Sequence, residues 1–361
     1  MIMQKFGISA IGLAIPQYGL PLTEFAKIYG VNPQQYTDNL GCKVMSLCGP
    51  NENSMTLASQ AAQRALNNWD GNKEDIGLVV VATETGLDMS RPLSSWVMSD
   101  LGLCGNIRSY EVKHACYGGT AAVRQALEWK IAGNSKNKAA LVIAADVSMY
   151  APGHSGEPTQ GAGAVAMIID NATIAAIDPI SYYWSDPQFD FWRPIGQAYP
   201  EVNGRLSLTC YINAVMSCFK QLAPTKELGE HLNAYQFVCM HVPFPKMVQK
   251  AFKHLGDFCG WDANTIQAQY QNKVLPTMQW NQQIGNSYTA SLWFAVANAL
   301  TKLQAKQQFL AFSYGSGCGA ELLTLQALQT NSSYPWQQEL EQDLAARTIV
   351  DADFYLKIRD K

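Results

Sequence analysis

Residues 109–133, SYEVKHACYGGTAAVRQALEWKIAG, constrain the fold more than any other part of the chain. The first six of them predict a short strand, and residues 121–131 predict an apolar helix that ends at Gly133. Cys116 therefore stands where a strand ends and a buried helix begins. The backbone N–H groups and the positive end of the helix dipole favour a thiolate there, which a nucleophilic cysteine needs. A small buried cysteine packed at a turn is the alternative interpretation.

The length of 361 residues exceeds the size at which one hydrophobic core stops growing, so we expect two packed halves. Residues 1–172 form the first half, with Cys116, and residues 173–361 form the second, with His241 and Asn286. Strands alternate with helices, which indicates an α/β fold. Buried strands are expected at 76–83, 139–145, 161–170, 235–240, 309–313 and 321–325. Helices are expected at 22–29, 55–69, 94–103, 121–131, 207–222, 246–258 and 283–300.

The order of these elements repeats between the two halves. The first half has a strand ending in Glu84, a turn and helix with Cys116, and a strand that starts with glycines. The second half has a strand ending in His241, a turn and helix with Asn286, and the glycine turn YGSGCG at 314–319. Two such halves would meet face to face with their apolar helices at the centre, and these four side chains would share one cleft.

Each candidate side chain also has an ordinary structural interpretation. Glu84 follows a buried strand, where desolvation would raise its pKa and make it a usable base, but it could be a helix N-cap or an ion-paired carboxylate. His241 precedes a turn with two prolines, but it could be a core histidine. Lys246 and Lys250 lie one helical turn apart, which also describes a solvated helix face.

Residues 178–206 predict a long irregular connection over the surface. They are rich in Tyr, Trp and Pro and contain DFWRP at 190–194. A connection of this length is more often functional than idle, although a packed lid without ligand contact is the alternative. The polar tail after residue 326 predicts a charged helix or a loose strand.

Composition excludes several classes of protein. The formal net charge is −3 and no Lys/Arg run is present, so we expect the protein to bind neither nucleic acid nor a membrane surface. A phosphate-bearing ligand would be bound by only a few cationic side chains. The nine cysteines are scattered without a C-x-x-C pair, which favours a reducing, cytoplasmic compartment over a disulfide framework. No Cys/His pair has structural-zinc spacing, so no metal is expected. No apolar run reaches transmembrane length, and the apolar start predicts a first strand rather than a signal peptide.

Seven motifs, in the same order along the chain, resemble 3-hydroxy-3-methylglutaryl-CoA synthase, and together they span about residues 5 to 326. They are ATETGLDMS at 82–90, ACYGGTAAV at 115–123, EPTQGAGAVAM at 157–167, DFWRP with the following YPEVNGRLSLTCY at 190–211, HVPFPKMVQKA at 241–251, GNSYTASL at 285–292 and FSYGSG at 312–317.

The resemblance implies a thiolase-like, five-layered αβαβα fold and a homodimer. It also implies an acyltransferase that joins acetyl-CoA to acetoacetyl-CoA, with release of free CoA, in the mevalonate route to isoprenoids. The two CoA thioesters are then substrates, and no cofactor is expected.

Carried over residue by residue, the resemblance assigns the chemistry to three side chains. Cys116 takes the acetyl group as a thioester, and Glu84 removes a proton from the acetyl methyl group and later returns one. His241 hydrogen-bonds the incoming ketone and protonates the new alkoxide. The substrate-binding residues implied are Asn286 at the acetoacetyl group, Ser316 at the acyl end, Lys246 and Lys250 at the CoA chain and its phosphates, and Thr159, Ser207 and Tyr150.

The chain departs from the family pattern at two positions. His114 replaces the usual Asn two places before the nucleophile, and Arg91 replaces the usual Lys after the acidic motif. These changes affect the expected positioning of the substrate rather than the type of reaction.

Three alternative functions stay open. A β-branching synthase of polyketide biosynthesis would take its substrates from acyl carrier proteins. A ketoacyl synthase of the Cys-His-Asn type would not need Glu84. A non-catalytic acyl-binding or scaffolding subunit would have kept only the fold.

Overall fold

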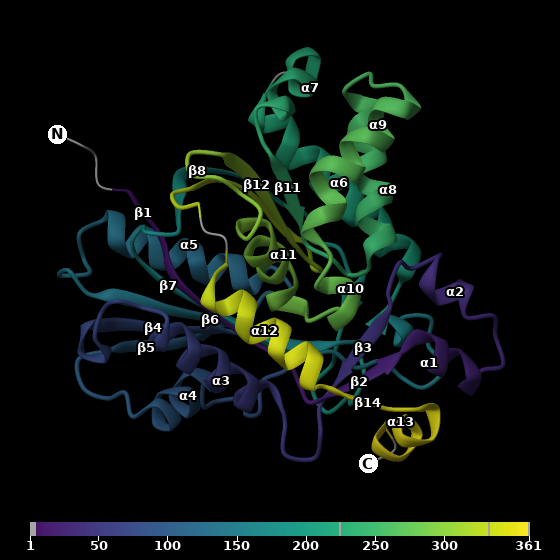
Figure 1. The fold of residues 1–361 in the computed structure, drawn as a ribbon, viewed down its shortest axis with the longest axis horizontal. Coiled ribbons are helices and arrows are strands. Elements are labelled where there is room, and N and C mark those ends of the chain that lie inside the picture. The colour runs from purple at the N-terminus through teal and green to yellow at the C-terminus, as the bar shows by residue number, and fades with distance from the viewer. Residues whose placement is uncertain (1–4, 224, 331–332, 360–361) are drawn as a thin grey trace.

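The computed structural model describes residues 5–223, 225–330 and 333–359, which form a mixed α/β protein (Figure 1). The first half contains β1 (Phe6–Ala14), α3 (Ser54–Asn67), β4 (Ile76–Ala82), α4 (Leu93–Leu101), β5 (Arg108–Val112), α5 (Gly118–Ile131), β6 (Ala139–Val147) and β7 (Ala162–Asn171). The second half contains β8 (Ala175–Ser185), α6 (Gly204–Leu222), β11 (Phe237–Met240), α8 (Pro245–Phe258), α11 (Ser291–Leu300), β12 (Gln308–Gly315) and β13 (Gly319–Ala327).

Smaller elements surround this framework. They are β2 (Tyr18–Pro21), α1 (Leu22–Ile28), α2 (Gln34–Thr37), β3 (Val44–Leu47), β9 (Phe191–Trp192), β10 (Glu201–Val202), α7 (Thr225–Asn233), α9 (Ala263–Gln269), α10 (Asn281–Ile284), α12 (Pro335–Ala346), β14 (Thr348–Ile349) and α13 (Ala352–Arg359).

One nine-stranded sheet runs in the order β11-β12-β13-β8-β1-β7-β6-β4-β5. Its two parts join where β1 meets β8 over two residue pairs, Gly7 with Ala176 and Ile8 with Ala175. The series β4-β6-β7-β1 in the first half and β11-β12-β13-β8 in the second have the same connectivity. In both series the first pair is parallel and the next two are antiparallel. The two halves of the chain therefore build sheets of the same design.

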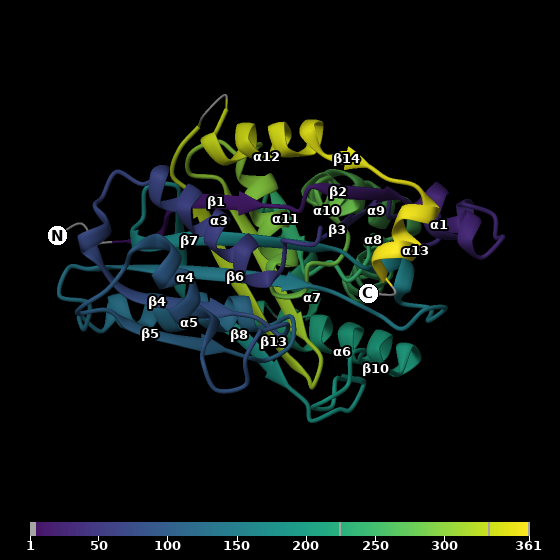
Figure 2. The same ribbon diagram turned by 90° about the horizontal axis from the view of Figure 1, so that it is seen from below.

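The elements are stacked in layers (Figure 1), and side chains alternate between the layers along each strand. Figure 2 shows the same ribbon from below, with α13 beside α1. In β4, Val79 faces the cluster that contains α3 and α4, whereas Val80 faces a central cluster that contains α5 and α11. In β12, Phe309 faces the same central cluster, whereas Leu310 faces α6 and α8. The order is helices, sheet, helices, sheet, helices, which is the expected αβαβα arrangement.

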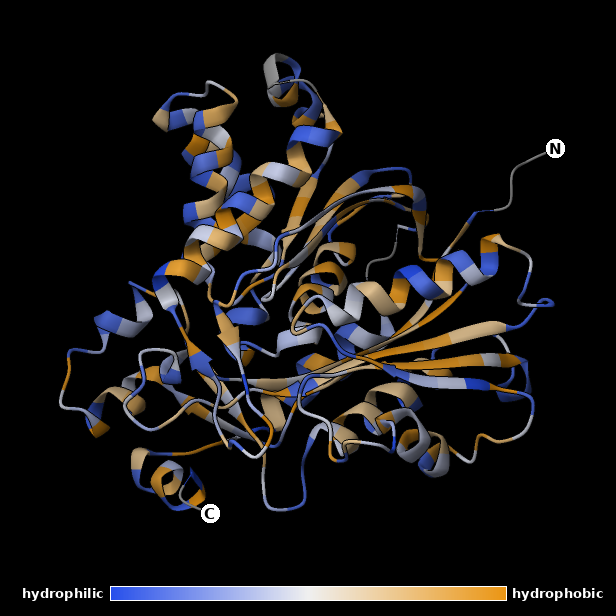
Figure 3. Ribbon diagram, turned by 180° about the vertical axis from the view of Figure 1, so that it is seen from behind, coloured by the Kyte–Doolittle hydropathy of each residue, from blue (hydrophilic) through white to orange (hydrophobic). Residues whose placement is uncertain are grey.

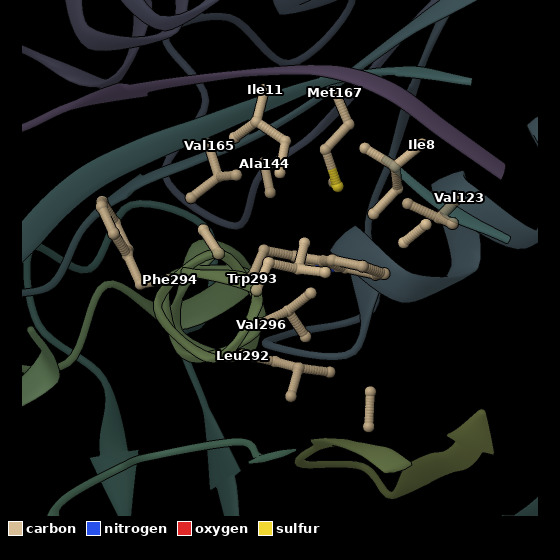
Figure 4. Close-up of a cluster of buried hydrophobic side chains, with 14 of the residues drawn as sticks. Ile8, Ile11, Val123, Ala144, Val165, Met167, Leu292, Trp293, Phe294 and Val296 are labelled. Carbon is tan, nitrogen blue, oxygen red and sulfur yellow. The ribbon is translucent and has the colours of Figure 1, made fainter. Parts of the chain in front are cut away.

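The central layer contains a helix, α11, that is buried on all sides. All ten residues of α11 are buried, as expected for a helix enclosed between two sheets. Figure 4 shows Trp293 of α11 among Ile11, Val165 and Met167, which come from β1 and β7. The strands around this layer are coloured mainly as hydrophobic in Figure 3. The two turns that precede α5 and α11 are thus held by the main core.

Two of the predicted elements are wrong in part. Residues 175–185 form the strand β8, so the irregular connection occupies only about residues 186–203. The predicted helix at 283–300 is interrupted, because Gly285 has a φ of +84° and a Cβ there would lie 2.0 Å from the carbonyl oxygen of Gln160. The chain turns at this point, and α11 begins only at Ser291.

Within the described residues, no helix is both long enough and apolar enough to span a lipid bilayer.

Candidate active site

Cys116 lies in the turn between β5 and α5, as predicted, and its thiol contacts a carboxylate. Its Sγ donates a hydrogen bond to Oε1 of Glu84 over 3.3 Å. The expectation of a thiolate is wrong: burial raises the pKa of the Cys116 thiol well above its usual value, and the nearby Glu84 and Asp146 carboxylates raise it further. A backbone hydrogen bond lowers this pKa but does not outweigh those causes. These shifts favour the neutral thiol of Cys116 over the thiolate.

Glu84 follows β4 and has the raised pKa that its position predicted. Burial raises the pKa of the Glu84 carboxyl to about 8, and the charge of Asp146 adds to this shift. The hydrogen bond from Cys116 and the nearby charge of Arg193 act in the opposite direction. Arg193 also donates a hydrogen bond from Nη2 to the Glu84 carbonyl oxygen over 2.8 Å. A carboxyl group with this pKa can exchange protons near neutral pH.

Asp146, at the end of β6, holds the Glu84 turn in place. It is fully buried, and its Oδ1 accepts hydrogen bonds from the backbone N–H groups of Glu84 (2.9 Å) and Thr85 (3.0 Å). Oδ1 also accepts from the hydroxyl groups of Thr83 and Thr85. Oδ2 accepts from the backbone N–H of Thr289, which comes from the second half of the chain. One carboxylate thus ties the turn that carries Glu84 to the segment that enters α11.

A cavity of about 320 Å³ brings most of the predicted site residues together. Glu84 lines an adjoining cavity of about 910 Å³, and both cavities are lined by Phe191, Tyr288 and Ser316. The predicted residues that line the smaller cavity are Cys116, Tyr150, Thr159, Ser207, His241, Lys250, Asn286 and Ser316.

Lys246 does not line the smaller cavity, although its predicted partner Lys250 does. Its Nζ donates a hydrogen bond to Oε1 of Gln249 over 3.0 Å, and it faces a neighbouring hollow that Lys250 and Lys253 also line. Lys250 therefore borders both the cavity and the hollow, whereas Lys246 borders only the hollow. Lys246 can meet a ligand only outside the cavity.

His241 lies at the end of β11 with 2% of its surface exposed. Burial lowers the pKa of its imidazole to about 3, so the ring is neutral at physiological pH. Its backbone is fixed on both sides: the N–H donates to Phe312 O, and the C=O accepts from the hydroxyl of Tyr211. A neutral imidazole donates one N–H hydrogen bond, which suits it to a developing oxyanion.

Asn286 reaches the cavity through the turn at Gly285. Its backbone N–H donates to Thr159 O over 3.0 Å, and its side-chain oxygen accepts from the backbone N–H of Tyr288 over 3.0 Å. These two bonds fix the side-chain amide where it lines the cavity beside Cys116.

Asp190, the first residue of DFWRP, anchors the irregular connection to the site. It is fully buried and accepts hydrogen bonds from Ser316 Oγ (2.9 Å), Tyr314 Oη (3.3 Å) and the backbone N–H of Gly317 (3.2 Å). The hydroxyl of Ser207 donates to its carbonyl oxygen over 3.3 Å. Since the next residue, Phe191, lines both cavities, this connection forms part of their walls.

Two family models match almost the whole chain. The model described as hydroxymethylglutaryl-coenzyme A synthase N terminal matches residues 2–173, and the C-terminal model matches residues 178–260 and 262–360. The chain belongs to this family.

Individual members of the hydroxymethylglutaryl-CoA (HMG-CoA) synthase family match along most of their length. A hydroxymethylglutaryl-CoA synthase of Enterococcus faecalis is 33% identical over 88% of this chain and 82% of its own. The solved structure of MvaS in complex with 3-hydroxy-3-methylglutaryl coenzyme A superposes with a TM-score of 0.89, at 32% identity over 99% of this chain and 92% of that one.

A second branch of the family matches the fold equally well. The HMG synthase of the curacin biosynthetic pathway, in complex with an acetyl donor-ACP, has a TM-score of 0.91 at 26% identity, over 99% of this chain and 88% of that one. The protein is therefore an acyl-transferring condensing enzyme with the thiolase-like fold of the HMG-CoA synthases, and the pathway it serves does not follow from these likenesses.

The two departures from the family pattern lie in different surroundings. His114 lines the larger cavity and packs edge-on against Tyr117, with ring centroids 5.4 Å apart. A Cβ at Gly319 would lie 2.7 Å from His114 Cε1, so the imidazole occupies space that only a glycine provides. Arg91 instead stacks over Trp96 at 3.9 Å, at the start of α4. His114 is thus the departure that reaches the synthase site.

Sequence reasoning assigned no role to Asp146 or Asp190. A signal was available for Asp146, because it directly follows the apolar run AALVIAA, just as Glu84 directly follows IGLVVVAT. The hydrogen-bond partners of the Asp190 carboxylate lie more than 120 positions away in the chain, so no local pattern identifies them.

Proposed function

We propose that this synthase condenses acetyl-CoA with acetoacetyl-CoA to give HMG-CoA and free CoA in the mevalonate pathway. The observation that carries the proposal is the 3.3 Å contact between the Cys116 thiol and the Glu84 carboxylate, beside a cavity that His241 and Asn286 also line. A nucleophile, a base and an oxyanion donor within one site are the three groups that a condensation through an acyl-enzyme needs.

The first step is transfer of the acetyl group. The Cys116 sulfur attacks the thioester carbonyl of acetyl-CoA, the acetyl–CoA bond breaks, and the proton of the thiol ends on the departing CoA sulfur. Glu84 then removes a proton from the acetyl methyl group, and the resulting carbanion attacks the ketone of acetoacetyl-CoA. The imidazole of His241 donates its N–H to the oxygen that becomes the alkoxide, and Asn286 orients the acceptor.

The last step must release the product from the enzyme. Glu84 passes the proton that it took from the acetyl methyl group to the alkoxide. One water then cleaves the thioester to Cys116: its hydroxyl group ends in the carboxyl group of HMG-CoA, which ionises, and its other proton restores the Cys116 thiol. The sum is acetyl-CoA, acetoacetyl-CoA and water to HMG-CoA and CoA. The proposal includes no cofactor, because the two CoA thioesters are the substrates.

Three lysines of α8 favour CoA over an acyl carrier protein as the carrier. Lys250 lines the cavity beside Cys116, and Lys246 and Lys253 line the hollow next to it. CoA carries a diphosphate and a 3′-phosphate, whereas the prosthetic group of a carrier protein has a single phosphodiester, so CoA gains more from these cations. The alternative is a β-branching synthase, since the curacin enzyme of the same fold was solved with a donor-ACP.

A comparison of acceptors tests this proposal. We expect kcat/KM with acetoacetyl-CoA to exceed that with acetoacetyl-carrier protein, and replacement of Lys246 and Lys250 by methionine to remove most of the difference. Substitution of Lys138, which is remote from the cavities, serves as the control. A preference for the carrier protein would overturn the assignment to the mevalonate pathway but not the assignment to the family.

His241→Ala is expected to weaken condensation far more than acetylation. The N–H of a buried donor aimed at a developing oxyanion contributes about 3 kcal/mol, so condensation should slow by roughly two orders of magnitude. Acetylation of Cys116 should change by only a few-fold. Rapid-quench measurement of both steps gives the ratio, and equal losses in the two steps would contradict the role of His241.

We also propose a homodimer. The support is that β5 forms one edge of the nine-stranded sheet, where a second copy could pair with it. Exposed aromatic and aliphatic side chains also occur in β8 and in the connection that follows it, among them Tyr183, Phe189 and Ile195. Light scattering after size-exclusion chromatography should give twice the mass of the 39.7 kDa chain, and a monomer would refute this proposal.

We propose the reducing cytoplasm as the compartment. The support is the scattered set of nine cysteines, each of which is a free thiol in the structure. A nucleophilic thiol also keeps its activity only where oxidation is reversed.

A further inference from the structure

The C-terminal tail from Arg347 to Arg359 packs behind the active site. Figures 1 and 2 both show α13 beside α1, on the side of the molecule where β14 joins β2. Tyr355 and Val350 are buried there in a small cluster with Phe25 and Leu20, separate from the main core. Leu40 and Phe244 also pack against this cluster and line the cavity beside Cys116. The tail therefore packs behind the part of the cavity wall that Leu40 and Phe244 form.

Glu157 is the polar centre of this contact. It is fully buried, and its Oε1 accepts a hydrogen bond from the hydroxyl of Tyr355 over 2.9 Å. Its Oε2 accepts from the hydroxyl of Tyr29 (2.6 Å) and from the backbone N–H of Gly153 (2.7 Å). Arg359 completes the group with an ion pair at 3.4 Å. One buried carboxylate thus joins α13, α1 and the segment that leads to Thr159.

The segment from 150 to 160 connects this cluster to the cavity. Its residues Tyr150, His154 and Thr159 line the cavity beside Cys116. Gln160 links the two sides directly: its Oε1 accepts the backbone N–H of Tyr150, and its Nε2 donates to the hydroxyl of Tyr355 over 3.0 Å. The Tyr355 hydroxyl is therefore bonded both to Glu157 and to the residue that fixes Tyr150.

The tail also reaches the opposite wall. Arg347 is buried, and its Nη1 donates to the carbonyl oxygen of Gln283 over 2.7 Å. Gln283 lies three positions before Asn286, whose backbone N–H bonds to Thr159 O. The two walls that meet at the Asn286–Thr159 contact thus share one support, the last part of the chain.

We propose that Tyr355 and Glu157 are positioning residues for thioester binding, acting through the segment 150–160. The side chains of this segment form a wall of the cavity only when the α13 contact holds Gly153 and Gln160 in place. The inference rests on the proposed function only for the choice of acetyl-CoA as the probe.

Tyr355→Phe is the sharpest test, because it keeps the ring that packs on Phe25 and removes only the hydroxyl with its two bonds. We expect hydrogen exchange of the amides in 150–160 to accelerate and KM for acetyl-CoA to rise roughly tenfold, with kcat of the bound complex changed less than about threefold. Glu157→Gln should act in the same direction. The double variant should be no worse than the stronger single one, because both remove the same contact.

Phe354→Leu is the matched control on the same helix. Phe354 packs on Tyr18, with ring centroids 4.8 Å apart, so its truncation weakens the docking of α13 without touching Glu157. It should lower the melting temperature at least as much as Tyr355→Phe while leaving KM unchanged. Equal effects of the two variants on KM, or unchanged exchange of 150–160 in Tyr355→Phe, would overturn the proposal. The exchange measurement needs no turnover, so it stands even if acetyl-CoA proves to be the wrong donor.

Discussion

Replacing Glu84 by alanine is expected to leave an enzyme that acetylates Cys116 but forms HMG-CoA about 10³-fold more slowly, since a positioned base contributes roughly 10²–10⁴-fold. The carboxylate of Glu84 contacts the Cys116 sulfur that we propose to carry the acetyl group, and its raised pKa suits it to remove the methyl proton. Acetylation should survive, because the charge of Glu84 raises the pKa of the Cys116 thiol and its loss favours the thiolate.

Single-turnover measurement separates the two steps in this variant. Glu111→Gln is a suitable control, because Glu111 lines the same larger cavity, is half-buried and also has a raised pKa, but its carboxylate accepts from the backbone N–H of Leu93 rather than from the thiol. Normal condensation by Glu84→Ala would place the base elsewhere and refute the assignment.

The pH dependence of the condensation rate should follow the ionisation of the Glu84 carboxyl group. A base must be deprotonated to accept the methyl proton, and burial raises the pKa of Glu84 to about 8. The rate of condensation from pre-acetylated enzyme should therefore increase with pH up to about 8 and then level off. In Glu84→Ala this increase should be absent, and an unchanged profile would assign it to another group.

Asp146→Asn is expected to reduce both stability and activity. The buried carboxylate accepts hydrogen bonds from both halves of the chain, and an amide replaces one accepting oxygen by a donor that faces other donors. We expect the free energy of unfolding to fall by about 3 kcal/mol, the scale of a broken buried network. Condensation should slow roughly 10²-fold, because misplacing a catalytic group by about 1 Å costs that much.

Urea denaturation and steady-state kinetics measure the two effects of Asp146→Asn. Asp75→Asn is the matched control, since the side chain of Asp75 is 48% exposed and its Oδ1 lies 3.5 Å from Nζ of Lys138, and such surface pairs contribute about 1 kcal/mol or less. If Asp146→Asn matched the wild-type protein in stability and rate, the carboxylate would not hold the Glu84 turn.

The strands of the two sheets could be predicted from the sequence where both faces are buried. Such strands form continuous apolar runs, as β4 and β6 do. The strand β8 was missed because beyond Ile177 its side chains are mostly exposed and it contains Pro179. Its pairing with β1 covers only two residues, so most of it has a neighbour on one side, where a proline is tolerated.

The predicted ionisation of Cys116 failed for a reason that the sequence does not show. The position at the helix start was correct, but burial and the negative charge of Glu84 outweigh the helix dipole. Only the fold places the two side chains, 32 positions apart in the chain, within hydrogen-bond distance. The contact of Lys246 with CoA stays a prediction: helical spacing places Lys246 one turn from Lys250, but it does not show that Lys250 lines the cavity beside Cys116 and Lys246 only the neighbouring hollow.

Mass spectrometry of the enzyme after mixing with acetyl-CoA alone tests the central claim most directly. We predict one acetyl group per chain on the peptide that contains Cys116, in the wild-type protein and in Glu84→Ala, and none in Cys116→Ala. Addition of acetoacetyl-CoA should then discharge the acetyl group from the wild-type enzyme but not from Glu84→Ala. An unmodified Cys116, or an acetyl group on another residue, would contradict the account.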